Sequence, residues 1–180
     1  MTDKTWNANG TREIGGKPPR HYFYPEGLLV YLYHTAPVDY MLILSKVDYI
    51  ITLLSGTSQK ERPQEYTLKS LSSILTRLRE LYSSKYPGKE LLSEMSYVVK
   101  MGADKYSYKG YQKGMEYSLF ISSFMGHFLK SLTEENDQES GLPHLLHCGA
   151  NILILMGYVN TKGIKSEFND IPKMFEKGGV

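Results

Sequence analysis

Two histidines lie three residues apart in the segment ESGLPHLLHCGAN, residues 139–151, just after a proline. If this segment is helical, His144, His147 and Asn151 share one face, because positions i, i+3 and i+7 nearly superimpose on an α-helix. Imidazole ligates metals and transfers protons near neutral pH, so this face could line a reaction site. The same spacing also fits a first helical turn whose histidines cap the preceding loop. The pair alone leaves both interpretations open.

A run of acidic residues precedes the histidines: Glu134, Glu135, Asp137 and Glu139. Carboxylate oxygens are the ligands that magnesium or manganese prefers, and a mixed set of carboxylates and imidazoles suits manganese or zinc. The alternative is a solvated loop, because the dipole of a following helix also favours carboxylates at its start. The sequence does not choose between a metal site and a solvated loop.

The segment GADKYSYKGYQKG, residues 102–114, interleaves glycine, lysine and tyrosine. Glycines let a backbone approach a ligand closely, lysines offset phosphate charge, and tyrosines can stack on a base. The candidate nucleotide-binding side chains are Lys105, Tyr106, Tyr108, Lys109, Tyr111 and Lys113. Their order is not that of a Walker phosphate-binding loop. An exposed flexible loop is the alternative.

Three further residues carry chemical groups within apolar surroundings. His127 stands between Phe124 and Phe128, which predicts a buried, hydrogen-bonded histidine. Glu94 lies near the apolar side of its predicted helix, where a carboxylate needs a partner or a metal unless it reaches the surface. Cys148 has no paired base on its own face, so we expect it to fill the core.

Helices must position these residues, because apolar residues recur at helical spacing along most of the chain. Residues 1–20, rich in glycine and proline, predict an irregular arm before a single domain of residues 21–180. The predicted helices span residues 26–36, 38–55, 64–86, 89–101, 116–132 and 142–159, followed by a short amphipathic piece near 171–175. No segment alternates as a strand would. The sequence therefore predicts an all-α bundle of roughly five to six helices.

The spacing of apolar residues also predicts which side chains face the core. The inward positions include Met41, Leu44, Val47, Ile51, Leu54, Leu68, Leu71, Ile74, Leu75, Leu78, Leu81, Leu91, Met95, Val98, Val99, Leu119, Phe120, Phe124, Phe128, Leu132, Leu145, Ile152 and Leu155.

The composition is that of an ordinary soluble protein, with 180 residues, 41% hydrophobic and 22% charged. A net charge of +2 gives no strong field, so we expect neither a nucleic-acid polymer nor a membrane as partner. The single cysteine allows no internal disulfide and fits a reducing compartment. The chain starts without a signal peptide, and Lys46 and Asp48 interrupt its longest apolar stretch. These features predict a cytoplasmic protein.

Four stretches taken in order resemble a known family: EMSYVVKMGADKY, GYQKG, GHFLKSL and DQESGLPHLLHCGANILIL. They are similar to the small phage and bacterial MazG-like dATP/dGTP diphosphohydrolases. The family pattern places a glutamate eight residues before G-A-x-K-Y, the position of Glu94, and ends in S-G-L-P-H-L-x-H-x-x-x-N, its most specific part. The similarity covers residues 88–158, which makes residues 38–86 look like an inserted helical hairpin.

The resemblance implies an all-α enzyme of bacterial or phage-infected cells that hydrolyses a purine deoxynucleoside triphosphate to monophosphate and pyrophosphate. It implies attack of water assisted by a divalent cation, magnesium or manganese. It also implies a homo-oligomer with residues 38–86 at the contact. The implied metal ligands are Glu94, Asp137, Glu139, His144 and His147. The implied catalytic residues are Glu94, His127, His144, His147 and Asn151. The implied substrate-binding residues are Lys105, Tyr106, Tyr108, Tyr111 and Lys113.

The chain departs from the family pattern at three positions. Gly110 and Tyr111 stand where the family has Asn-Trp, and Gly126 stands where it has an arginine. Two alternatives to an enzyme therefore stay open. One is a phage protein that sequesters a nucleotide without turnover, as a counter-defence factor would. The other is a helical assembly protein in which the polar motif only stabilises the fold.

Overall fold

The computed structural model describes residues 26–105 and 110–176. The helices are α1 (Glu26–Thr35), α2 (Val38–Leu54), α3 (Pro63–Lys85), α4 (Leu91–Lys105), the 3-10 helix η2 (Gly110–Lys113), α5 (Tyr117–Lys130), α6 (His144–Lys162) and α7 (Ile171–Glu176). These ranges contain no β-strand, only an isolated bridge between Asn136 and Pro143. The predicted all-α fold is confirmed. The predicted arm of residues 1–20 and the residues Tyr106, Tyr108 and Lys109 lie outside the described residues.

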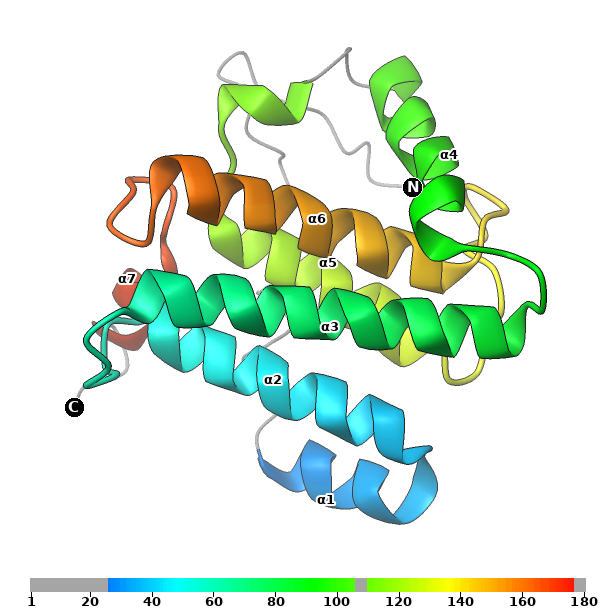
Figure 1. Ribbon diagram of the computed structural model, residues 1–180, viewed down its shortest axis with the longest axis horizontal. Helices are drawn as coiled ribbons and strands as arrows, with labels where there is room; N and C mark the ends of the chain where they lie inside the picture. Colours follow the sequence, from blue (N-terminus) through cyan, green and yellow to red (C-terminus); the bar gives the residue numbers. More distant parts are fainter. Residues whose placement is uncertain (1–25, 106–109, 177–180) are drawn as a thin grey trace.

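Helix α6 lies at the centre of the bundle, where it contacts α3, α4 and α5 (Figure 1). Helix α2 packs against α3, and α1 and α7 both contact α2. In Figure 1, α3, α5 and α6 run alongside one another, while α4 rises from the end of α6 at which that helix begins. Side chains at the start of α6 are therefore within reach of several other elements.

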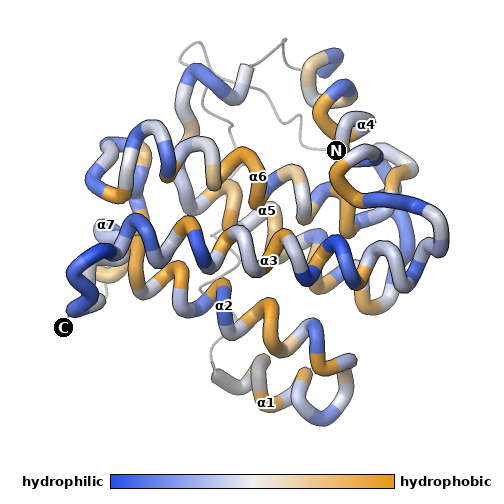
Figure 2. The backbone as a smooth tube through the Cα atoms, in the orientation of Figure 1, coloured by the Kyte–Doolittle hydropathy of each residue, from blue (hydrophilic) through white to orange (hydrophobic). Residues whose placement is uncertain are grey.

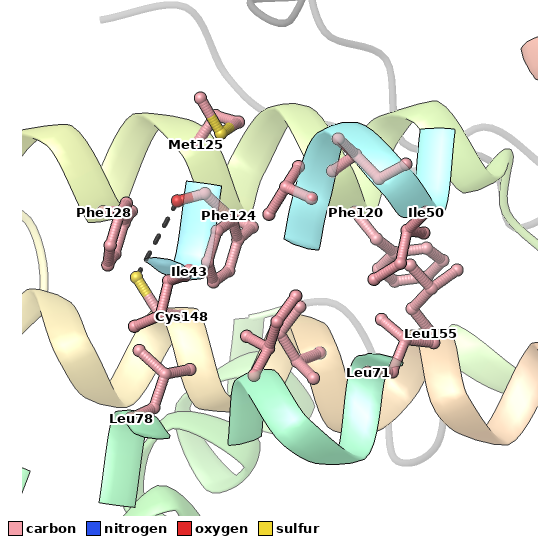
Figure 3. Packing of buried hydrophobic residues seen from close by; sticks show 14 of the residues in the cluster. Ile43, Ile50, Leu71, Leu78, Phe120, Phe124, Met125, Phe128, Cys148 and Leu155 are labelled. Atoms are coloured by element: carbon pink, nitrogen blue, oxygen red, sulfur yellow. Dashed lines mark hydrogen bonds between the residues drawn. The ribbon is translucent and has the colours of Figure 1, made fainter. Parts of the chain in front are cut away.

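The core forms where α2, α3, α5 and α6 meet. Figure 3 shows Ile43, Leu71, Phe124 and Leu155 converging from these four helices, and each is at most 1% exposed. Cys148 is also fully buried, with its Sγ 3.8 Å from the carbonyl oxygen of Phe124. Burial raises the pKa of the Cys148 thiol well above its usual value. The prediction that Cys148 fills the core is confirmed.

Proline and glycine set the boundaries of the helices near the core. Pro63 is the first residue of α3, and Pro37 and Pro143 directly precede α2 and α6. Proline suits these places because the first turn of a helix does not use the missing N–H. Gly163 ends α6 with φ of 79°, a left-handed conformation that favours glycine.

The structure of α4 differs from two predictions. It continues to Lys105 instead of stopping at Met101, and residues 110–113 form the helix η2, so the expected loop of residues 102–114 is partly helical. Val99, expected to face the core, is 44% exposed. The physical reason is that α4 diverges from α6 as it rises (Figure 1), so its buried residues, Leu91 and Met95, both lie near its start.

The segment 38–86, predicted as an inserted hairpin, is built into the core. Val47 and Ile50 of α2 and Ile74 and Leu78 of α3 are all buried within the same cluster as the apolar residues of α5 and α6. Figure 2 shows hydrophilic residues in the α2–α3 connection and a mixture of hydrophilic and hydrophobic residues along α3, typical of an amphipathic helix. None of the described helices combines the length and the apolar character required to cross a membrane.

Two glycines of α6 provide a matched test of how closely α4 packs. A Cβ on Gly149 would collide with Sδ of Met95 and lie 3.0 Å from Leu91, whereas a Cβ on Gly157 would meet no atom within 4 Å. We predict that Gly157→Ala stabilises the protein by about 0.5–1 kcal/mol, because alanine favours helix. Gly149→Ala should instead destabilise it by about 1–3 kcal/mol through overpacking. Urea denaturation measures both, and equal stabilisation by the two variants would contradict the packing described.

Candidate functional site

Three histidines form a cluster where α5 ends and α6 begins: His127, His144 and His147. Nδ1 of His127 lies 3.0 Å from Nδ1 of His144. The ring of His127 stacks on that of His147, with centroids 4.4 Å apart and planes 9° from parallel. His144 is fully buried and His147 is 7% exposed. The histidine face predicted for residues 144–151 thus meets a histidine of the preceding helix. His127 is hydrogen-bonded, as expected, but it is half-buried and not buried as predicted.

The loop between α5 and α6 brings a carboxylate to this cluster through a tight turn. The backbone N–H of Asp137 donates to the carbonyl of Leu142 at 2.8 Å, and that of Gly141 donates to the carbonyl of Asp137 at 2.8 Å. Gly141 has φ of 70°, which favours glycine. The Asp137 carboxylate accepts the Ser140 N–H and hydroxyl, both at 3.0 Å. These bonds hold Asp137 in one position beside the N-terminus of α6.

Burial raises the pKa of Asp137, but the hydrogen bonds from Ser140, with the nearby His127 and His147, outweigh it and lower the pKa below its usual value. Asp137 is therefore ionised at neutral pH. An ionised carboxylate beside three imidazoles can attract and bind a cation.

Asp137, His127 and His144 form a candidate metal-binding group. Each offers one ligand atom, and the three atoms lie within 4.8 Å of one another. Nε2 of His144 is buried and has no hydrogen-bond partner among the described residues, since Oε2 of Glu134 is 3.7 Å away. A buried polar atom without a partner is costly, and a cation would relieve that cost. Two imidazoles and a carboxylate fit manganese or zinc, and magnesium less well.

Asn151 links the two helices beside the histidine cluster. Its amide nitrogen donates to the carbonyl oxygen of His147 at 2.9 Å and to the hydroxyl of Ser123 on α5 at 3.1 Å. The family resemblance implies a catalytic role for this residue. These bonds place the Asn151 side chain between α5 and α6 on the face that carries His147.

Two predicted carboxylate ligands lie outside the three-residue group. Glu94 on α4 accepts a hydrogen bond from the hydroxyl of Tyr82 and lies 3.6 Å from the ammonium of Lys89. Burial, and then the Glu94 carboxylate, raise the pKa of the Tyr82 hydroxyl, which keeps its proton. Glu139 forms an ion pair with Lys105 at the end of α4. The structure brings Lys105 to the acidic loop, a contact that the sequence did not predict.

Within the segment of residues 102–114, the structure describes the residues up to Lys105 and those from Gly110 onward, and the two parts contact different regions of the bundle. Lys105 is held at the acidic loop, whereas Tyr111 is half-buried and Lys113 exposed in η2. The residue after η2, Gly114, has φ of 109° and lies directly under the ring of Phe168. Because Phe168 contacts Tyr158 near the end of α6, η2 lies roughly 16 Å along α6 from His147. Tyr111 and Lys113 are thus separated from the histidine cluster, while Lys105 is close to it.

Residues 81–167 match the sequence profile of a family described as dATP/dGTP diphosphohydrolase, N-terminal. This segment belongs to the dATP/dGTP diphosphohydrolase family. The match spans α4, α5 and α6 and includes the whole histidine cluster and the acidic loop. It confirms the resemblance seen in the sequence and supports a hydrolase that acts on nucleotides. A search of the curated proteins and a search of the solved structures found no match.

The lowered pKa of Asp137 makes a pH-dependent contribution to stability. A carboxylate with a depressed folded-state pKa stabilises the fold fully above its unfolded-state pKa, near 3.8, and loses this effect as pH falls through the lower folded-state value. We predict that the difference in unfolding free energy between the native protein and Asp137→Asn is constant above about pH 5 and narrows below pH 3.8. Urea denaturation across this range measures it, and a difference that widens on acidification would refute the assignment.

Proposed function

We propose that the protein is a metal-dependent hydrolase that converts a purine deoxynucleoside triphosphate to the monophosphate and pyrophosphate. One observation carries the proposal: within the segment that matches the diphosphohydrolase family, ligand atoms of His127, Asp137 and His144 lie within 4.8 Å of one another. These residues come from α5, the acidic loop and α6, so only folding assembles them. The buried Nε2 of His144, which has no hydrogen-bond partner among the described residues, also suits a metal ligand.

His127, Asp137 and His144 would hold the divalent cation, magnesium or manganese, and their two imidazoles favour manganese of the two. When bound, such a cation offsets phosphate charge and makes water a better nucleophile. His147, stacked on His127, is the protein's candidate for moving a proton beside this group. Asn151 would keep α5 and α6 in register there.

Lys105 is the candidate phosphate-binding residue close to the site. Its ion pair with Glu139 is partly exposed, and such pairs contribute little to stability, so a triphosphate could replace the carboxylate. Glu139 would then be released toward the cation as a further oxygen ligand. We propose Glu94, now held by Tyr82, as a second such carboxylate. Tyr106, Tyr108, Tyr111 and Lys113 stay proposed contacts to the base and the phosphates.

The first experiment is incubation with each of the four deoxynucleoside triphosphates plus magnesium or manganese, followed by ion-exchange chromatography. We predict a purine monophosphate and pyrophosphate as products. His144→Ala should reduce turnover by roughly 10²-fold or more and weaken manganese binding measured by calorimetry, because it removes a ligand. His34→Ala, on the exposed face of α1, is the matched control and should retain both.

Other outcomes of this experiment separate the alternatives. Release of orthophosphate would contradict the proposed reaction. Retention of a nucleotide without product would favour a sequestering protein, and neither retention nor product would favour a structural role. A folded His147→Ala variant with unchanged hydrolysis would exclude His147 from the scheme.

We also propose that the protein is a homo-oligomer with the segment 38–86 at the contact. Val38 at the start of α2 is 61% exposed, and the adjoining α1, outside this segment, continues the apolar surface with Val30, Tyr31 and Tyr33, each about 60% exposed or more. Exposed apolar groups concentrated at one end of a bundle are typical of an interface. We predict that sedimentation velocity finds a species larger than a monomer, and that Tyr33→Lys with Val38→Lys shifts it toward the monomer. A strict monomer at high concentration would refute the proposal.

A further inference from the structure

The hydroxyl of Ser140 lies at the meeting point of three polar groups. Its oxygen is 3.0 Å from Oδ2 of Asp137, 2.8 Å from Nε2 of His147 and 3.2 Å from the backbone nitrogen of Leu142. Ser140 is half-buried, and His147 is 7% exposed. A hydroxyl with three short contacts in a poorly hydrated place is constrained, because it owns one proton and two lone pairs.

Counting protons fixes the direction of each bond. The N–H of Leu142 can only donate, so it takes one lone pair of the Ser140 oxygen. Oδ2 of Asp137 accepts from both the backbone N–H and the hydroxyl of Ser140, so it takes the single hydroxyl proton. One lone pair of Ser140 remains for His147. Nε2 of His147 must therefore be the donor, because two acceptors at 2.8 Å would repel each other.

We propose that Ser140 is a positioning residue that fixes His147 in the tautomer protonated at Nε2, so that His147 accepts a proton or ligates a cation only through Nδ1. The Ser140 hydroxyl donates to the Asp137 carboxylate and accepts from the His147 imidazole, so it links the two groups. A histidine at a reaction site generally uses one ring nitrogen, while the N–H of the other is held by an acceptor that sets its orientation. Ser140 is that acceptor here.

The same bonds orient the ring as well as its proton. Nε2 is tied to Ser140 on the acidic loop, and the ring face lies on His127 of α5, with the planes 9° from parallel. Two contacts from different elements therefore fix both the rotation and the tilt of His147. Ser140 makes its bonds only because the turn of residues 137–142 places its backbone N–H on the Asp137 carboxylate.

This role deepens the proposed hydrolase function and rests on it for its kinetic consequence, but the tautomer can be measured without any turnover. The measurement is a long-range ¹H–¹⁵N correlation spectrum of the ¹⁵N-labelled protein, at a pH at which His147 is neutral. The native protein should show His147 protonated at Nε2, with a proton that exchanges slowly with water. Protonation at Nδ1 in the native protein would overturn the proposal without the need for any variant.

Two variants and a control then test Ser140 itself. Ser140→Ala should speed exchange of the Nε2 proton and make the second tautomer visible, whereas Ser140→Thr, which keeps the hydroxyl, should preserve the native spectrum. Ser96→Ala removes an exposed hydroxyl of α4, which donates to the carbonyl oxygen of Ser93, and should leave the His147 signals unchanged. A Ser140→Ala spectrum identical to the native one would overturn the assignment.

Kinetics gives a second readout. If the native protein hydrolyses a nucleotide, Ser140→Ala should lower kcat by roughly 10- to 100-fold with little change in KM, and Ser140→Thr should restore most of it. A native protein with the predicted tautomer but without hydrolysis would refute the proposed function while leaving the role of Ser140 intact. An unchanged kcat in an active protein would overturn that role.

Discussion

The burial of the first two turns of α6 is the constraint on which the rest of the site depends. Residues 144–150 are all buried, although two of them are histidines. An imidazole taken out of water must find partners, and a helix enclosed on every side cannot turn a polar face to solvent. The partners therefore have to come from other elements, and the bundle supplies them from α5 and from the loop before α6.

The close approach of α4 to α6 follows from a glycine at the contact, Gly149. Gly149 lets Met95 and Leu91 of α4 pack directly on the α6 backbone. This contact fixes the start of α4, and the direction of α4 then carries Lys105 to the acidic loop, where it pairs with Glu139. The contact of α4 with Gly149 on one side of α6 thus decides where the ammonium group of Lys105 lies relative to the histidine cluster on the other side.

Much of this arrangement could be predicted from local pattern. Helical spacing identified the long helices and most of their buried residues, because the side that packs on neighbours must be apolar. It failed for Val99 and for the end of α4, where the helix leaves the bundle and the pattern no longer reports on packing. The segment 38–86 stays a predicted insertion relative to the family motif, and its Ile43 and Leu78 are as deeply buried as Phe124 of α5.

The sequence by itself determined the all-α class, the family of the segment from α4 to α6, and the alignment of His144, His147 and Asn151 on one helical face. Those properties depend on spacing along one element or on a contiguous motif. Only the tertiary structure decided that Asp137 joins His127 and His144 while Glu94 and Glu139 take other partners. The physical reason is that these pairings depend on how α4 and α5 pack on α6 and on the turn at Asp137. Contacts between separate elements produce no regular spacing of residue types in the sequence, so spacing alone cannot predict them.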